Sequence, residues 1–118
     1  MQICCPAKFI CLFLIFGLTV QTLADTYGVI WTEGIDPSIT LQSETLHVGD
    51  SLLILNPWNR PVFEVNEEEY NSCELNYTGT LRGENNLINY DISQTGPFYL
   101  ASSLIYCLEG LKLSKVVS

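Results

Sequence analysis

Residues that could carry out catalysis or bind a metal are few in this sequence and widely separated. The single histidine, His47, lies in a strand-like stretch beside a turn, outside any elbow or triad pattern of a nucleophilic enzyme. One imidazole alone makes no metal site. No phosphate-binding loop, CxxC pair or GxGxxG pattern occurs. Carboxylate pairs are the remaining candidates for acid–base catalysis, but 13 acids among 118 residues make chance pairs common, so we predict that the protein is no enzyme.

One run of acids stands out, Glu67-Glu68-Glu69 between Asn66 and Tyr70. Its functional interpretation is a cation site. However, Asn66 is a typical N-cap residue, and Glu69 stands at the third helical position, which is the spacing of a capping box. Three acids in a first turn also suit the positive end of a helix dipole. We therefore predict a short helix over residues 67–72, leading into Cys73.

The first 24 residues have the layout of a secretory signal peptide. Lys8 precedes an apolar run over residues 9–20, and small side chains at Thr22 and Ala24 occupy positions −3 and −1 of a cut before Asp25. The alternative is a retained membrane anchor, but a spanning helix needs about 20 apolar residues and this run has 12. We predict a signal peptide over residues 1–24 and a secreted domain over residues 25–118.

The composition limits the partners. The formal charge is −8, and it becomes −9 once Lys8 is removed. Such a balance excludes binding to nucleic acid or to anionic membrane surfaces, which require clustered Lys and Arg. With 47% apolar and 15% charged residues, the chain is not largely disordered. The C-terminal residues include no polar spacer with an apolar tail, so we expect no lipid anchor.

Cleavage leaves two cysteines, Cys73 and Cys107, in a chain bound for an oxidising compartment. A single disulfide between them is the favoured interpretation, and two buried free thiols are the alternative. The bond would close a loop of 34 residues, for which chain entropy gives about 3–4 kcal/mol. It would leave no thiol to join His47 in a metal site. Asn76-Tyr77-Thr78 is an acceptor sequon, so we predict a glycan on Asn76.

Short β-prone runs separated by turn residues make up most of the predicted domain, which is typical of a β-sandwich or barrel. Gly49-Asp50 is a turn signal between two of these runs, and Asn56-Pro57 ends the second. The predicted strands cover residues 27–31, 38–41, 45–48, 51–55, 61–65, 87–92, 98–101 and 111–117.

Two blocks of the sequence resemble the phytocyanins, a family of plant cupredoxins. Leu46-His-Val-Gly-Asp-Ser-Leu-Leu-Ile54, with Val62-Phe-Glu-Val65 and Tyr70-Asn-Ser-Cys73 after it, resembles the family's "VGDxL…V..V…Y..SC". Gly96-Pro-Phe-Tyr-Leu-Ala101 and the run from Tyr106 to Leu113 resemble its "GPFYFIS…HCxxGQKL" ending. The resemblance implies an all-β, cupredoxin-like Greek-key sandwich with one short helix and one disulfide, Cys73–Cys107.

The likeness is greatest to the early nodulin-like branch, whose members bind no copper. The family's two copper-binding histidines fall at Arg60 and Tyr106, its ligand cysteine falls at Ala101, and its axial ligand falls at Leu111. Ala101 and Leu111 have no donor atom, and Arg60 is a permanent cation. A blue-copper site needs two histidines, a thiolate and a weak axial ligand. We therefore expect no copper and no other cofactor.

The end of the sandwich that corresponds to the copper site of the phytocyanins carries apolar and aromatic residues instead. Exposed apolar surface with Tyr or Trp often marks a binding site. We expect a binding module for a cell-wall glycan, a glycoprotein or a receptor ectodomain, secreted into the wall space or associated with the outer face of the plasma membrane. The residues of this patch are Trp58, Leu104, Ile105, Tyr106 and Leu111.

Four alternatives stand beside this hypothesis. The patch residues could simply fill the volume of the former metal site. The protein could be a copper electron carrier, as other phytocyanins are, or a wall enzyme with an acid pair in a cleft. It could also be a degenerate product, because the region between Asp25 and Leu46 is shorter than is usual in the family and Trp31 matches the family pattern only loosely.

Overall fold

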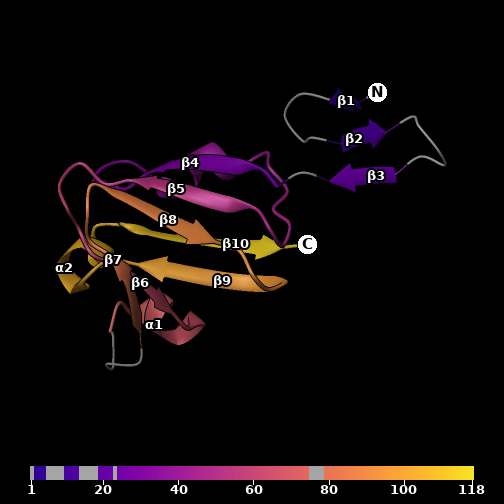
Figure 1. Cartoon of the computed structure of the whole chain (residues 1–118). Coiled ribbons are helices and arrows are strands. Elements are labelled where there is room, and N and C mark those ends of the chain that lie inside the picture. Colours follow the sequence, from indigo (N-terminus) through magenta and orange to yellow (C-terminus); the bar gives the residue numbers. More distant parts are fainter. Residues whose placement is uncertain (1, 5–9, 14–18, 23, 75–78) are drawn as a thin grey trace.

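The computed structural model describes residues 2–4, 10–13, 19–22, 24–74 and 79–118 (Figure 1). Strands β1 (Gln2–Cys4), β2 (Ile10–Phe13) and β3 (Thr19–Thr22) form a small antiparallel sheet. Within the described ranges this sheet pairs with no later strand. All three strands precede Asp25, so the predicted cleavage would remove them. No helix among the described residues is long and apolar enough to cross a membrane.

Seven strands form the sandwich (Figure 1). The first sheet has the order β4 (Thr26–Ile30), β5 (Ser51–Leu55), β8 (Leu87–Asp91), with β4 parallel to β5 and β8 antiparallel to it. The second sheet has the order β10 (Lys112–Val117), β9 (Gly96–Ala101), β6 (Val62–Val65), β7 (Thr80–Gly83), and it is antiparallel throughout.

Alternation along the strands builds the core. Successive strand residues face opposite sides, so every second side chain of β5 and β8 is directed at the other sheet. In β5 these are Leu52 and Ile54, and in β8 they are Ile88 and Tyr90. The core cluster is Val29, Trp31, Leu41, Leu46, Leu52, Ile54, Val62, Ile88, Tyr90, Ile92, Phe98, Leu100, Leu111, Leu113 and Val117. The prediction of an all-β sandwich is therefore confirmed, and the segment between Asp25 and Leu46 supplies β4 to it.

Two sequence predictions in that segment are wrong. Residues 38–41 form part of a 3₁₀ helix, η1 (Pro37–Leu41), because Pro37 is preset for a helical start and the Asp36 carboxylate caps the Ser38 N–H at 3.0 Å. Residues 45–48 form no strand, apart from one bridge between Leu46 and Val117, because the chain turns at once through His47 to Asp50.

The predicted helix over residues 67–72 is confirmed as α1 (Glu67–Ser72). The Asn66 side chain accepts from the Glu69 N–H at 2.8 Å, and the Glu69 carboxylate accepts from the Asn66 N–H at 3.1 Å, which completes the capping box. The helix ends at Cys73, whose left-handed φ of 60° is a common helix terminator. The acidic run is therefore a helix start. A second helix, α2 (Leu104–Leu108), was not predicted.

The predicted disulfide is also confirmed. Cys73 at the end of α1 bonds to Cys107 in α2, with the Cα atoms 5.7 Å apart. Both cysteines are buried in a small cluster with Val65 and Ala101. The bond joins α1 to α2, and the cluster packs both cysteines against β6 and β9 of the second sheet.

Candidate functional site

The loops at one end of the sandwich hold most of the predicted site residues. Because β4 and β5 are parallel, both end there, at the left of Figure 1, and so does β9, which leads into α2. The loop over residues 56–61 connects β5 to the start of β6 at the same end. Arg60, Tyr106, Ala101 and Leu111 thus come from three separate parts of the chain to one region.

Arg60 and Tyr106 are in direct contact. The guanidinium carbon of Arg60 lies 4.2 Å from the centre of the Tyr106 ring, which is a cation–π distance. Its Nε donates to Oε1 of Glu33 at 2.8 Å. The pKa of Glu33 is lowered, first by a hydrogen bond from its own backbone and then by the positive charge of Arg60, against an opposing effect of burial. Arg60 is therefore held from two sides, by an aromatic face and a carboxylate.

A buried asparagine fixes the loop that carries Arg60. Asn56 donates to the carbonyls of Arg60 (2.7 Å) and Asn85 (3.0 Å) and accepts from the Arg60 N–H (2.9 Å). The buried Trp31 indole donates to the Pro61 carbonyl at 3.3 Å. Sequence reasoning did not assign Glu33, Asn56 or Trp31 to the site. The only sequence signal was Asn56-Pro57, which indicated no more than the end of a strand.

Ala101 and Leu111 lie beneath this surface. Leu111 donates its N–H to the Tyr106 carbonyl at 2.9 Å and accepts from the Ser102 N–H at 3.1 Å. Both side chains are buried. Beside Ala101, the Ser102 hydroxyl is buried and has no hydrogen-bond partner. Leu111 belongs to the main core, against which Tyr106 packs, whereas Ala101 lies in the small cluster around the disulfide.

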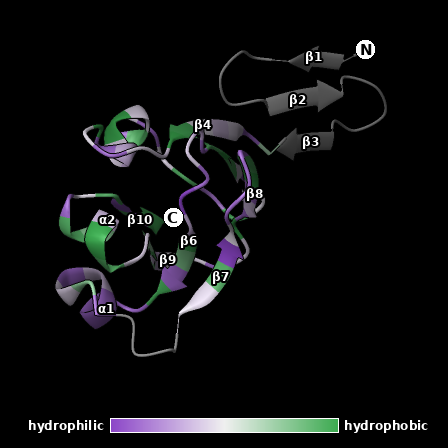
Figure 2. Cartoon of the chain, turned by 90° about the vertical axis from the view of Figure 1, so that its left-hand side faces the viewer, coloured by the Kyte–Doolittle hydropathy of each residue, from purple (hydrophilic) through white to green (hydrophobic). Residues whose placement is uncertain are grey.

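Four apolar side chains project outward at the same end. Trp58 is 63% exposed, Leu104 54%, Ile105 62% and Leu108 67%. Residues 104, 105 and 108 share one face of α2, because side chains three and four positions apart are neighbours on a helix. Figure 2 shows α2 in the colour of hydrophobic residues at this end. We call these four residues the apolar end surface. Leu108 was not predicted to belong to the patch. The prediction of Leu111 as a patch residue is wrong, because its side chain is 1% exposed and packs in the core.

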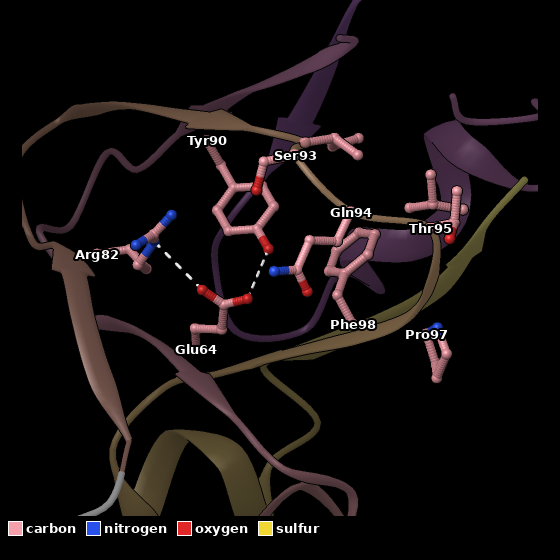
Figure 3. A pocket seen from close by; sticks show the side chains of 10 residues that line it. Glu64, Arg82, Tyr90, Ser93, Gln94, Thr95, Pro97 and Phe98 are labelled. Carbon is pink, nitrogen blue, oxygen red and sulfur yellow. Dashed lines mark hydrogen bonds and ion pairs between the residues drawn. The ribbon is translucent and has the colours of Figure 1, made fainter. Parts of the chain in front are cut away.

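A separate pocket of 240 Å³ lies between the two sheets (Figure 3). Glu64 is its central acid: Oε2 accepts from the Tyr90 hydroxyl at 2.8 Å, and Oε1 lies 3.5 Å from Nε of Arg82. Burial, and next the hydrogen bond to Glu64, raises the pKa of Tyr90 well above its usual range. The lining holds no imidazole or thiol, and its one carboxylate is already paired. This pocket offers hydrogen-bonding groups.

Two other predicted features lie elsewhere. His47 precedes β5, whereas Arg60 follows it, so the histidine is at the opposite end of the sandwich. The predicted glycan site, Asn76, lies outside the described residues. Among the residues the structure describes, no group of three His, Cys, Asp or Glu side chains is arranged to hold a metal ion.

No protein-family model matches this chain, and the search of curated proteins found no match to it. Solved structures are similar. Spinach plantacyanin has a TM-score of 0.66 at 18% identity, covering 79% of this chain and 99% of that one. Cucumber basic protein, a blue copper protein, has 0.64 at 19%, covering 75% and 90%. Cucumber stellacyanin with Cu²⁺ has 0.67 at 22%, covering 80% and 96%.

Structural matches at these low identities show the fold and nothing finer. The chain is a cupredoxin-like β-sandwich, similar in structure to the phytocyanins plantacyanin and stellacyanin.

Proposed function

We propose that this protein is a secreted, non-catalytic binding module that keeps the phytocyanin frame without its copper. The observation that carries the proposal is the packing of Arg60 on Tyr106. In the resemblance to the phytocyanin motifs, these two residues stand where copper-binding members have their histidines. A stacked guanidinium already paired with Glu33 supplies a positive charge where a metal ion would need a neutral donor.

The chemistry of the surrounding donors also argues against copper. A blue-copper ion requires a thiolate, and both cysteines of residues 25–118 are joined in the disulfide. The remaining positions of the alignment, Ala101 and Leu111, carry hydrocarbon side chains. The one imidazole, His47, belongs to the other end of β5. The residues at these positions do not fit a blue-copper ion, and we propose no electron transfer for this protein.

The apolar end surface is the proposed contact with a partner. Trp58 supplies a rigid aromatic anchor, and Leu104, Ile105 and Leu108 supply an aliphatic helix face. Aliphatic side chains make no hydrogen bonds to sugar hydroxyls, so these contacts favour a protein surface over a free glycan. We therefore propose the ectodomain of a receptor or the protein portion of a wall glycoprotein as the partner. The disulfide is consistent with an extracellular location.

Binding of the secreted protein to a panel of receptor ectodomains, deglycosylated wall proteins and glycans tests the proposal. Trp58→Ala and Leu104→Ala should each weaken the protein–protein contact at least tenfold. Val116→Ala is the matched control, because Val116 is an exposed apolar residue of β10, outside the apolar end surface. Binding to glycans alone, or equal affinities in all variants, would reject the assignment of this surface. Adding Cu²⁺ should give no blue thiolate absorption, and a blue product would favour the electron carrier.

A further inference from the structure

The end of the sandwich opposite the apolar end surface holds two buried acids side by side. Asp25 is 8% exposed and Asp50 4% exposed. The backbone nitrogen of Asp25 donates to Oδ1 of Asp50 at 3.0 Å, and the backbone nitrogen of His47 donates to Oδ2 of Asp50 at 2.8 Å. Each Asp50 oxygen therefore already accepts from a backbone N–H. A buried carboxylate normally requires a compensating positive charge as well.

Charged groups around Asp50 supply little of that compensation. The Asp25 carboxylate accepts from the Tyr27 hydroxyl at 3.3 Å and adds a second negative charge. Burial first, then the charges of Asp25, Asp50 and Glu44, raises the pKa of Tyr27 to about 12. The imidazole of His47 is half exposed, and its Nδ1 lies 3.9 Å from Oδ2 of Asp50. Lys115 donates from its Nζ to the Leu41 carbonyl at 2.7 Å. Ser118 donates its N–H to Leu46.

The predicted cleavage site lies at the position where a positive charge would compensate Asp50. Thr22 and Ala24 place the cut immediately before Asp25, whose nitrogen is the atom that faces Asp50. Hydrolysis of the Ala24–Asp25 peptide bond by water leaves a carboxylate on Ala24 and an amino group on Asp25. At neutral pH that amino group is an ammonium, since its ordinary pKa is about 7.7–8.0. Cleavage would thus convert a neutral donor into a cation already within hydrogen-bond distance.

We propose that the Asp50 carboxylate binds the new N-terminus. Removal of the signal peptide then completes a buried ion pair between the Asp25 α-ammonium and the Asp50 carboxylate. The proposal rests on the predicted cleavage and is independent of the proposed function. The pair lies where the first sheet begins, because the Ser51 N–H donates to the Asp25 carbonyl at 2.9 Å and Thr26 pairs with Ser51. It fastens the first residue of the processed domain to the turn that precedes β5.

The ion pair has a defined pH dependence. An ammonium that gains a partner on folding has a higher pKa folded than unfolded. Its contribution to stability is complete below the unfolded pKa of about 7.7–8.0 and is lost as the pH rises through the folded pKa. The pH profile of Asp50→Asn should lack this alkaline loss.

The full-length precursor, produced in a eukaryotic secretory host, supplies the material for the test. Mass spectrometry of the secreted protein gives its first residue. The pH dependence of α-amine labelling by an amine-reactive reagent gives the pKa of that amine in the native and the urea-unfolded chain. Asp50→Asn is the test variant, and Glu84→Gln is the control, because Glu84 is an exposed acid elsewhere on the surface.

The secreted protein should begin at Asp25, and the pKa of its amine should be at least one unit above that of the unfolded chain. That shift makes native labelling at pH 8 several-fold slower. Glu84→Gln should keep the shift and Asp50→Asn should abolish it. If Asp50→Asn is not secreted, the comparison of native and unfolded wild type decides. A different first residue, an unshifted amine, or a shift that survives in Asp50→Asn would overturn the proposal.

Discussion

The guanidinium carbon of Arg60 lies 4.2 Å from the centre of the Tyr106 ring, although Arg60 belongs to the loop after β5 and Tyr106 belongs to α2. Glu33, 27 residues before Arg60, completes the arrangement from a third segment. Three chain segments are thereby joined through one cation.

Replacing the residues at the four aligned positions tests whether they are the copper-ligand positions. We expect Arg60→His alone to give no blue copper centre, because the thiolate and the second imidazole are still missing. Arg60→His combined with Ala101→Cys, Tyr106→His and Leu111→Gln should bind Cu²⁺ and develop the strong blue thiolate absorption. Visible absorption after copper addition measures this. A folded but colourless quadruple variant would show that the alignment places the site wrongly.

The Glu33–Arg60 pair predicts a pKa change that nuclear magnetic resonance can follow. The lowered pKa of Glu33 means that its ionised form stabilises the fold at pH values above its unfolded pKa. This stabilisation is lost as the pH falls through the lower, folded pKa. Arg60→Gln should raise the pKa of Glu33 toward its ordinary value without restoring it fully, because the backbone hydrogen bond remains. An unchanged pKa in Arg60→Gln would contradict the role given to the ion pair.

Asn56 should be among the most sensitive polar residues. Asn56→Ala leaves the Arg60 carbonyl and N–H and the Asn85 carbonyl without their partner, and we expect a loss of roughly 2–4 kcal/mol in the free energy of unfolding. Asn86→Ala, an exposed control near the same loop, should cost less than about 0.5 kcal/mol. Urea unfolding of both variants provides the comparison. Equal losses in the free energy of unfolding would contradict the role of Asn56 in holding the loop in place.

Substitutions in the apolar end surface and at the buried Leu111 should differ in their effect on the free energy of unfolding. Trp58→Ala should change the free energy of unfolding by less than about 0.5 kcal/mol, because the ring is mostly exposed. Leu111→Ala should cost about 2–5 kcal/mol through the cavity that it leaves. A large loss in Trp58→Ala, measured by the same unfolding method, would mean that the ring fills structural volume and is not free for a partner.

The disulfide should contribute about 3–4 kcal/mol by closing a loop across 34 residues. The double variant Cys73→Ala, Cys107→Ala avoids new polar groups and isolates that effect. We expect a lower urea midpoint and no further change on adding a reductant. A double variant as stable as the wild type would show that packing of α1 and α2 suffices without the bond.

Local signals made parts of this fold predictable. The capping box of Asn66 and Glu69 acts within four residues, so α1 could be bounded from the sequence. The pairing of Cys73 with Cys107 followed from there being two cysteines after the predicted cleavage. β7 (Thr80–Gly83) was missed because Leu81 is its one large apolar residue and it is exposed, so no alternation marked the strand.

The site was predictable only in outline. The resemblance to phytocyanins brought Arg60 and Tyr106 to one end, and the structure places them in contact. It did not indicate Glu33 as the carboxylate beside Arg60, because no local pattern connects residues so far apart. The burial of Leu111 was also hidden, since an apolar residue after a glycine reads equally well as surface or core.

The order of the strands in the second sheet has a consequence for biosynthesis. β6 pairs with β7 on one side, but its other neighbour is β9, which pairs in turn with β10, so the β6–β9 and β9–β10 pairings need residues from Gly96 onward. The sulfur partner of Cys73 also comes late, at Cys107. A chain that emerges from its N-terminus therefore keeps its earlier apolar strands uncovered until residues 96–118 have followed, and these strands are accessible to chaperones until then.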